Sequence, residues 1–171
     1  MDNAVVAFFV GSKSDIGKIA EAKKFFDDMR IPYVTHITSA HRTPGRTNNW
    51  TKSLEKEGCK IFICAAGMAA HLAGAVKAWT SKPVIGLPLT SGRSPLHGMD
   101  ALFSTVQMPS GMPVATVGID MDKNAAILAA EILALSNPEI ADKLMAMRAN
   151  MTTDVIKDDD DMNEGPNAPI A

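Results

Sequence analysis

The strongest constraint on the fold is a regular alternation between short apolar runs and longer stretches with a helical period. The apolar runs are rich in β-branched and aromatic residues and lie at residues 5–10, 33–38, 60–64, 84–87 and 114–119. The stretches with helical spacing lie at residues 16–29, 44–57, 70–80, 100–106, 123–135 and 138–156. Strands that alternate with helices pair in parallel, and continuously apolar strands are typical of a sheet covered on both faces. The sequence therefore predicts an α/β fold, a three-layer α/β/α sandwich with a flavodoxin-like parallel sheet of about five strands.

Length and charge set the domain organisation and the kinds of partner. A chain of 171 residues fits one domain, which we expect to span residues 1–157, including the last helix. Five acids and no bases lie in residues 158–171, which predicts a disordered acidic tail and leaves residues 1–157 with a net charge of +3. The net charge of −2 for the whole chain argues against nucleic-acid binding, whereas the mildly basic residues 1–157 suit a small anionic ligand. No apolar run approaches the ~18 residues of a membrane span, and we expect a cytoplasmic protein.

Ligands of such sheets bind beyond the carboxyl ends of the strands, where the strand order reverses, so the loops after the first three strands matter most. The first loop holds Ser12, Ser14 and Asp15 after Gly11. Its hydroxyls and the N–H groups at the helix start can bind a phosphate, and Asp15 can cap the helix or accept hydrogen bonds from a sugar. The alternative is a well-capped turn without a ligand. The spacing matches neither a dinucleotide fingerprint nor a Walker loop.

The second loop places Ser39, Ala40, His41 and Arg42 at the end of a strand. Arginine offers a planar fork for phosphate or carboxylate, and histidine exchanges protons near neutral pH. This combination favours a site with both an anion and a proton transfer. The alternative is a polar, solvated loop that leads into a helix.

The third loop is rich in small residues, at Ala66, Gly67 and Ala69, and continues into His71 and Leu72. Small side chains let a ligand lie against the backbone, and N–H groups at a helix start can face a carboxylate or released CO2. Close packing of a helix on a sheet also requires small residues, so this alternative stays open. His71 can equally be a structural histidine that fixes the loop.

Several motifs occur in order along the chain and together resemble one family. They are G-S-K-S-D, S-A-H-R-T-P, A-G-x-A-A-H-L-x-G, P-V-I-G-x-P, D-A-L-x-S-T-V-Q-M-P and N-A-A-I-L-A-A-E-I-L. Over residues 4–150 the sequence resembles the N5-carboxyaminoimidazole ribonucleotide mutases of purine biosynthesis. The resemblance implies a flavodoxin-like homo-octamer without metal, ATP or another cofactor. It implies transfer of a carboxyl group from the exocyclic nitrogen to ring carbon four of an aminoimidazole ribonucleotide, and functional coupling to the ATP-dependent synthetase that makes this substrate.

The resemblance also implies roles for individual residues. It assigns proton transfer to His41 and binding of phosphate and ribose to Ser12, Asp15 and Arg42. The remaining substrate-binding residues would be Ser14, Ser39, Ala40, Ala66, Gly67, Ala69, His71 and Leu72. Met68 and Ala73 stand where these mutases usually have glycine and proline, and the loop at residues 91–97 is about two residues longer than usual.

Two alternative functions remain open. The first is an aminoimidazole ribonucleotide carboxylase that uses free CO2, a sister class that typically has lysine where Arg42 stands. The second is a non-catalytic, phosphate-binding regulatory module, which would require Ser12 and Arg42 but not His41.

Overall fold

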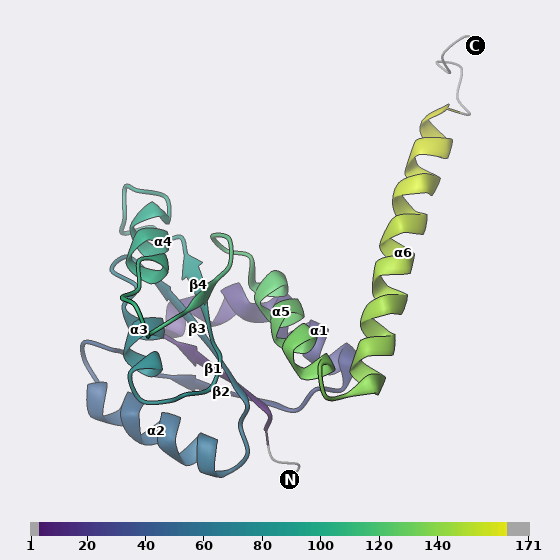
Figure 1. Ribbon diagram of the computed structural model, residues 1–171. Coiled ribbons are helices and arrows are strands. Elements are labelled where there is room, and N and C mark those ends of the chain that lie inside the picture. The colour runs from purple at the N-terminus through teal and green to yellow at the C-terminus, as the bar shows by residue number, and fades with distance from the viewer. Residues whose placement is uncertain (1–3, 164–171) are drawn as a thin grey trace. The chain divides into compact units, whose positions relative to one another are not determined.

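A computed structural model describes residues 4–163 and contains one five-stranded parallel sheet in the order β2-β1-β3-β4-β5 (Figure 1). The strands are β1 (Val6–Val10), β2 (Tyr33–Ile37), β3 (Ile61–Gly67), β4 (Val84–Leu89) and β5 (Ala115–Thr116). The helices are η1 (Lys13–Ile19), α1 (Ala20–Met29), α2 (Pro44–Lys56), α3 (Leu72–Lys77), α4 (Met99–Val106), α5 (Asp122–Ala134) and α6 (Pro138–Asn163). The chain divides into two compact units, Met1–Ala129 and Ala130–Ala171, which we describe separately.

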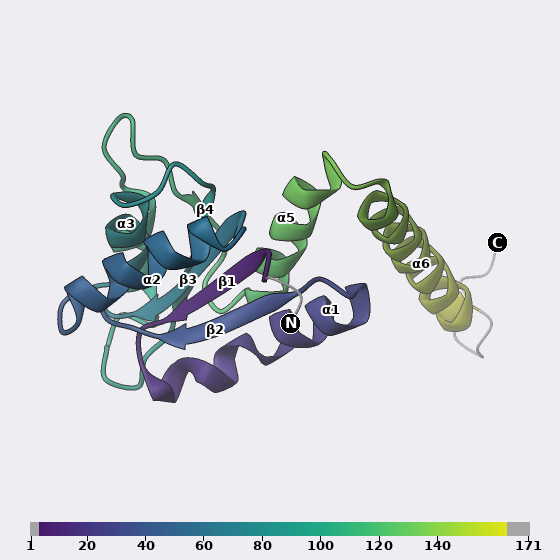
Figure 2. The ribbon, with the colours of Figure 1, turned by 90° about the horizontal axis from the view of Figure 1, so that it is seen from below.

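In the first unit, the two faces of the sheet pack against different helices. Phe8 faces α1, where its ring lies 5.6 Å from that of Phe26 between centroids. Phe9 points to the opposite face and packs with Phe62 in the cluster that also holds Leu54 of α2 and Val76 of α3. Figure 2 shows α2 and α3 on one side of the sheet and α1 on the other. The predicted flavodoxin-like α/β sandwich is therefore confirmed.

The strand order fixes where the sheet presents its loops. β1 pairs with both β2 and β3, with Val6 aligned to Tyr33 on one side and to Ile61 on the other. The chain leaves β1 toward β2 and later returns to the other side of β1 as β3. The order thus reverses between β1 and β3, and the loops at their carboxyl ends flank a crevice suited to a ligand.

Two elements differ from the sequence prediction. Residues 13–19 form a 3-10 helix, and the α-helix begins only at Ala20. Glycine at position 17 weakens an α-helical turn there. β5 is an edge strand of two residues, Ala115–Thr116, in place of the predicted 114–119. Beyond Thr116 the chain still bonds to β4 through the N–H groups of Val117 and Asp120, and it turns at Asp120, which adopts a left-handed conformation with φ 55°.

The second unit consists mainly of α6. The side chain of Asn137 caps this helix by accepting hydrogen bonds from the backbone N–H groups of Glu139 and Ile140. The sequence predicted an end near residue 156 and disorder from residue 158, but the helix continues to Asn163. No glycine or proline interrupts the chain between Pro138 and Gly165, so nothing in the backbone stops the helix earlier. The rest of the predicted tail, residues 164–171, lies outside the described residues, and the single domain at 1–157 stays a prediction.

Within residues 4–163, no helix combines the length and the apolar character that crossing a membrane requires.

Candidate functional site

The loops that follow β1, β2, β3 and β4 surround one pocket of about 480 Å³ at the carboxyl edge of the sheet. Every site residue predicted from the sequence lines it: Ser12, Ser14, Asp15, Ser39, Ala40, His41, Arg42, Ala66, Gly67, Ala69, His71 and Leu72. The structure adds Gly11, Met68, Ser91 and Arg93, which the sequence analysis did not select. The sequence therefore identified the place of the pocket, while the roles of its residues stay predictions.

The first loop is a capped turn that opens toward the pocket. The Ser12 hydroxyl accepts a hydrogen bond from the backbone N–H of Ser14, at 3.4 Å, and its oxygen lies 3.0 Å from the hydroxyl oxygen of Ser14. Gly11 lies against the third loop, since a Cβ on it would lie 3.4 Å from that of Ala66. The capped turn is thus present, and the same residues also line the pocket.

Asp15 is the acidic side chain of this loop. Burial raises the pKa of its carboxyl group, and this effect outweighs both the hydrogen bond that the Ser14 hydroxyl donates at 3.3 Å and the charge of Lys18. A carboxylate that is partly shielded from water gains from a hydrogen-bond donor on a ligand, because such a donor restores the lost solvation. Asp15 therefore suits a sugar hydroxyl better than an anionic group.

The second loop is held by its own hydrogen bonds. The Ser39 hydroxyl accepts from the backbone N–H of Arg42 at 3.2 Å, and the Thr43 hydroxyl accepts from that of Ser39 at 2.9 Å. The guanidinium of Arg42 donates to the carbonyl of Gly11 at 3.5 Å, so it extends over the first loop. The phosphate-binding hydroxyls proposed for the first loop and the cation of the second loop thus lie at one end of the pocket.

His41 and His71 form a pair across the pocket. His41 Nε2 lies 2.8 Å from His71 Nδ1, with the rings 4.9 Å apart in an edge-on arrangement. One nitrogen donates the hydrogen and the other accepts it, so this bond fixes which nitrogen of each ring faces the other. Sequence reasoning could not choose between a binding and a structural role for His71. In the structure it is the hydrogen-bond partner of the predicted catalytic histidine.

The third loop closes tightly around its small residues. A Cβ on Gly67 would lie 3.1 Å from the carbonyl oxygen of Leu89 and 3.4 Å from the Cβ of Ser91, so this position leaves little room for a side chain. Met68 adopts φ 57°, in the region that favours glycine. The Ser104 hydroxyl of α4 accepts a hydrogen bond from the N–H of Ala70 at 2.9 Å. These contacts fix the part of the pocket wall that the third loop forms.

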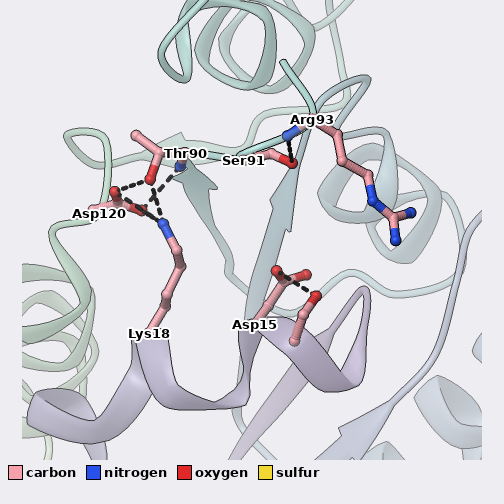
Figure 3. A network of polar contacts seen from close by, with 7 residues as sticks. Asp15, Lys18, Thr90, Ser91, Arg93 and Asp120 are labelled. Carbon is pink, nitrogen blue, oxygen red and sulfur yellow. Dashed lines mark hydrogen bonds and ion pairs between the residues drawn. The ribbon is translucent and has the colours of Figure 1, made fainter. Parts of the chain in front are cut away.

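The fourth loop, at residues 90–98, brings a second arginine to the pocket. A polar network secures its start: Lys18 of η1 contacts the Thr90 hydroxyl and forms an ion pair with Asp120 at 2.9 Å, and the Thr90 N–H donates to Asp120 at 3.0 Å (Figure 3). Burial opposes ionisation of Asp120, but the hydrogen bonds from Thr90 and Lys18 and the charge of Lys18 together lower its pKa. Sequence reasoning missed Arg93 because it selected site residues only from the first three loops and noted only the length of the loop at residues 91–97. The signal was a cation in a Gly- and Ser-containing loop after the fourth strand.

Residues 4–163 contain no group of three or more His, Cys, Asp or Glu side chains placed to hold a metal ion. The polar groups that line the pocket are hydroxyls, two arginines, two histidines and one carboxylate. This set can bind an anionic, hydroxylated ligand and move a proton.

Comparison with known proteins identifies the family. The AIR carboxylase family model matches residues 5–154. An N5-carboxyaminoimidazole ribonucleotide mutase of Pyrococcus abyssi is 47% identical over 146 residues, which cover 85% of this chain and 83% of that protein. A phosphoribosylaminoimidazole carboxylase of Schizosaccharomyces pombe is 40% identical over 164 residues, 96% of this chain but 29% of that protein. The crystal structure of Treponema denticola PurE superposes with a TM-score of 0.85 at 31% identity, over 93% of this chain and 98% of the other. Since these matches span most of its length, the chain belongs to the AIR carboxylase family.

Proposed function

We infer that the chain converts N5-carboxyaminoimidazole ribonucleotide into 4-carboxy-5-aminoimidazole ribonucleotide, an isomerisation in purine biosynthesis. Three mutase relatives share 45–47% of the aligned residues, and this inference follows their function. The observation that carries it in the structure is the hydrogen-bonded pair of His41 and His71 in a pocket that Arg42 also lines. A proton-transfer pair beside an anion-binding arginine fits a ribonucleotide whose reaction consists of proton and carboxyl transfer.

The chemistry requires one proton to be given and one to be taken. Protonation of the carbamate nitrogen breaks its bond to the carboxyl carbon and releases CO2 inside the pocket. Carbon four of the resulting aminoimidazole attacks this CO2, and the proton on that carbon must then leave. His41 gives the first proton and accepts the second, and its hydrogen bond to His71 orients the ring. General acid–base catalysis of this kind contributes about 10²–10⁴-fold.

Binding roles follow from the position of each loop. Ser12, Ser14 and Arg42 bind the 5′-phosphate, together with the N–H groups at the start of η1, and Asp15 accepts a hydrogen bond from the ribose. Ala66, Gly67 and Ala69 form the wall that holds CO2 beside carbon four. Holding both reactants in place avoids the entropy cost of capturing CO2 again from solution.

We propose that the chain acts as a homo-octamer in the cytoplasm. Exposed apolar side chains support association between copies: Met99, Phe103 and Val106 lie along one side of α4, and Met151, Val155 and Met162 along one side of α6. Light scattering at micromolar concentration tests this assembly, and a mass near that of the 18.2 kDa monomer would refute it. The family resemblance adds functional coupling to the synthetase that makes the carbamate.

One assay separates the proposed reaction from the alternatives. The purified chain is supplied either with the carbamate substrate or with aminoimidazole ribonucleotide plus bicarbonate, and formation of the 4-carboxy product is followed. We expect turnover of the carbamate at low bicarbonate. Efficient carboxylation from bicarbonate with no use of the carbamate would indicate a carboxylase, the function named for the Schizosaccharomyces pombe relative. Ligand binding without any turnover would indicate a regulatory module.

A further inference from the structure

The pocket contains two arginines that reach it from opposite sides of the point where the strand order reverses. Arg42 follows β2 and Arg93 follows β4, and the sheet order β2-β1-β3-β4 separates these strands by three spacings. At about 4.8 Å per spacing, the two strand ends are roughly 14 Å apart. The pocket thus has one cation on each side of the reversal point, an arrangement that suits a ligand with an anionic group at each end.

The two guanidinium groups also differ in their hydrogen bonding. That of Arg42 donates to the carbonyl of Gly11. That of Arg93 has no acceptor within residues 4–163, where only the backbone N–H of Arg93 is bonded, to the Ser91 hydroxyl at 3.3 Å. Figure 3 shows this side chain extended away from the network at Thr90. Its five N–H donors are therefore available to a ligand.

We propose that Arg93 binds the carboxylate of the substrate and product, while Arg42 binds the phosphate; this assignment rests on the mutase function proposed above. The segment that carries Arg93 packs directly on the third loop, which forms the proposed wall beside CO2. The Cβ of Ser91 and the carbonyl oxygen of Thr90 lie 3.4 and 3.5 Å from the position that a Cβ on Gly67 would occupy. A carboxylate presents two coplanar oxygens, which match the planar fork of an arginine.

The network of Lys18, Thr90 and Asp120 is the positioning element for Arg93. It links η1, the end of β4 and the segment after β5, and so holds the start of the loop three residues before Arg93. The other end of the loop is held at Gly98, where a Cβ would lie 2.6 Å from a methyl group of Ile119. With both ends fixed, Arg93 loses less conformational freedom when it binds than it would on a free loop.

A pair of ligands that differ only in the carboxylate tests the assignment. Calorimetry would compare 4-carboxy-5-aminoimidazole ribonucleotide with 5-aminoimidazole ribonucleotide, which has the same phosphate. We expect Arg93→Gln to raise Kd for the carboxylated ligand by about 10-fold or more and to change Kd for the other by less than about twofold. Arg93→Lys should recover part of the affinity, whereas Arg42→Gln should weaken both ligands alike.

The network is tested with a matched lysine. Lys18→Met should weaken the carboxylated ligand selectively, whereas Lys24→Met, which breaks an exposed ion pair with Asp28 on α1, should change neither affinity. If Arg93→Gln weakened the affinity for both ligands equally, or for neither, the proposal would be overturned. Wild-type protein that binds neither ligand would overturn the mutase function itself, which is a distinct result.

Discussion

Replacing His41 with glutamine separates its contact with His71 from its ability to move a proton. His41 bonds to His71 through Nε2, the far nitrogen of the ring, at 2.8 Å. The amide of a glutamine reaches about as far as Nε2, whereas that of an asparagine lies nearer to Nδ1. Glutamine therefore keeps a hydrogen-bonding group opposite His71, but it cannot exchange a proton near neutral pH.

The expected effect is large on turnover and small on stability. Both chemical steps assigned to His41 lose their acid or base, so kcat should fall by about 10²–10⁴-fold, which corresponds to about 3–5 kcal/mol in the barrier. The side chain is exposed and its replacement retains a hydrogen bond, so the free energy of unfolding should change by less than about 1 kcal/mol.

The assay follows product formation from the carbamate substrate, together with thermal unfolding and binding of the carboxylated product. His36→Gln is the matched control, because His36 does not line the pocket. Its ring stacks on that of Trp50, with 3.9 Å between the ring centroids. The control should keep its turnover. A His41→Gln enzyme that retained more than about a tenth of the wild-type kcat would refute the acid–base role, given the range for that effect.

Three further predictions concern binding and stability. Arg42→Ala should raise KM more than it lowers kcat, because a phosphate contact exists in both the ground and transition states; an unchanged KM would exclude that contact. The folded state lowers the pKa of Asp120, so its ionised form stabilises the fold. In chemical unfolding, the stability lost in Asp120→Asn should therefore be greatest above about pH 4 and should shrink as the pH falls through the folded pKa. Gly86→Ala should lower the free energy of unfolding by about 1–3 kcal/mol, because the new Cβ would clash with the Thr105 methyl group. In Gly45→Ala the new Cβ meets no atom within 4 Å, so the free energy of unfolding should rise by up to about 1 kcal/mol. The reverse order of unfolding midpoints would contradict this prediction.

The position of the pocket followed from the sequence because it depends on local patterns. Alternating strands and helices fix a parallel sheet, and the carboxyl ends of parallel strands meet at one edge. The loops after β1, β2 and β3 therefore had to lie together, whatever their detailed conformation. The residues selected in them, such as Ser12, His41 and Gly67, all line the pocket for this reason.

The network of Lys18, Thr90 and Asp120 at the start of the fourth loop could not be predicted from the sequence, because it depends on contacts between distant segments. Lys18 and Asp120 are separated by 102 positions, and no periodicity links them. The contribution of Arg93 depends in turn on where this network holds Thr90. A sequence pattern indicates that a loop follows a strand, but the direction of that loop is decided by tertiary contacts.

The backbone conformations at this edge of the sheet illustrate the same limit. Four residues of 4–163 other than glycine have a positive φ. Arg30 ends α1, and the other three, Met68, His97 and Asp120, follow β3, β4 and β5. Each such conformation costs of order 1 kcal/mol or more and persists only where surrounding contacts require it. At Asp120 these contacts are the hydrogen bonds that its carboxylate accepts from Lys18 and from the Thr90 N–H, and the bond that its own N–H donates to the Pro88 carbonyl. The ion pair and the turn therefore act together: the left-handed turn is the conformation in which this carboxylate meets Lys18 and Thr90, and these bonds offset the cost of the turn.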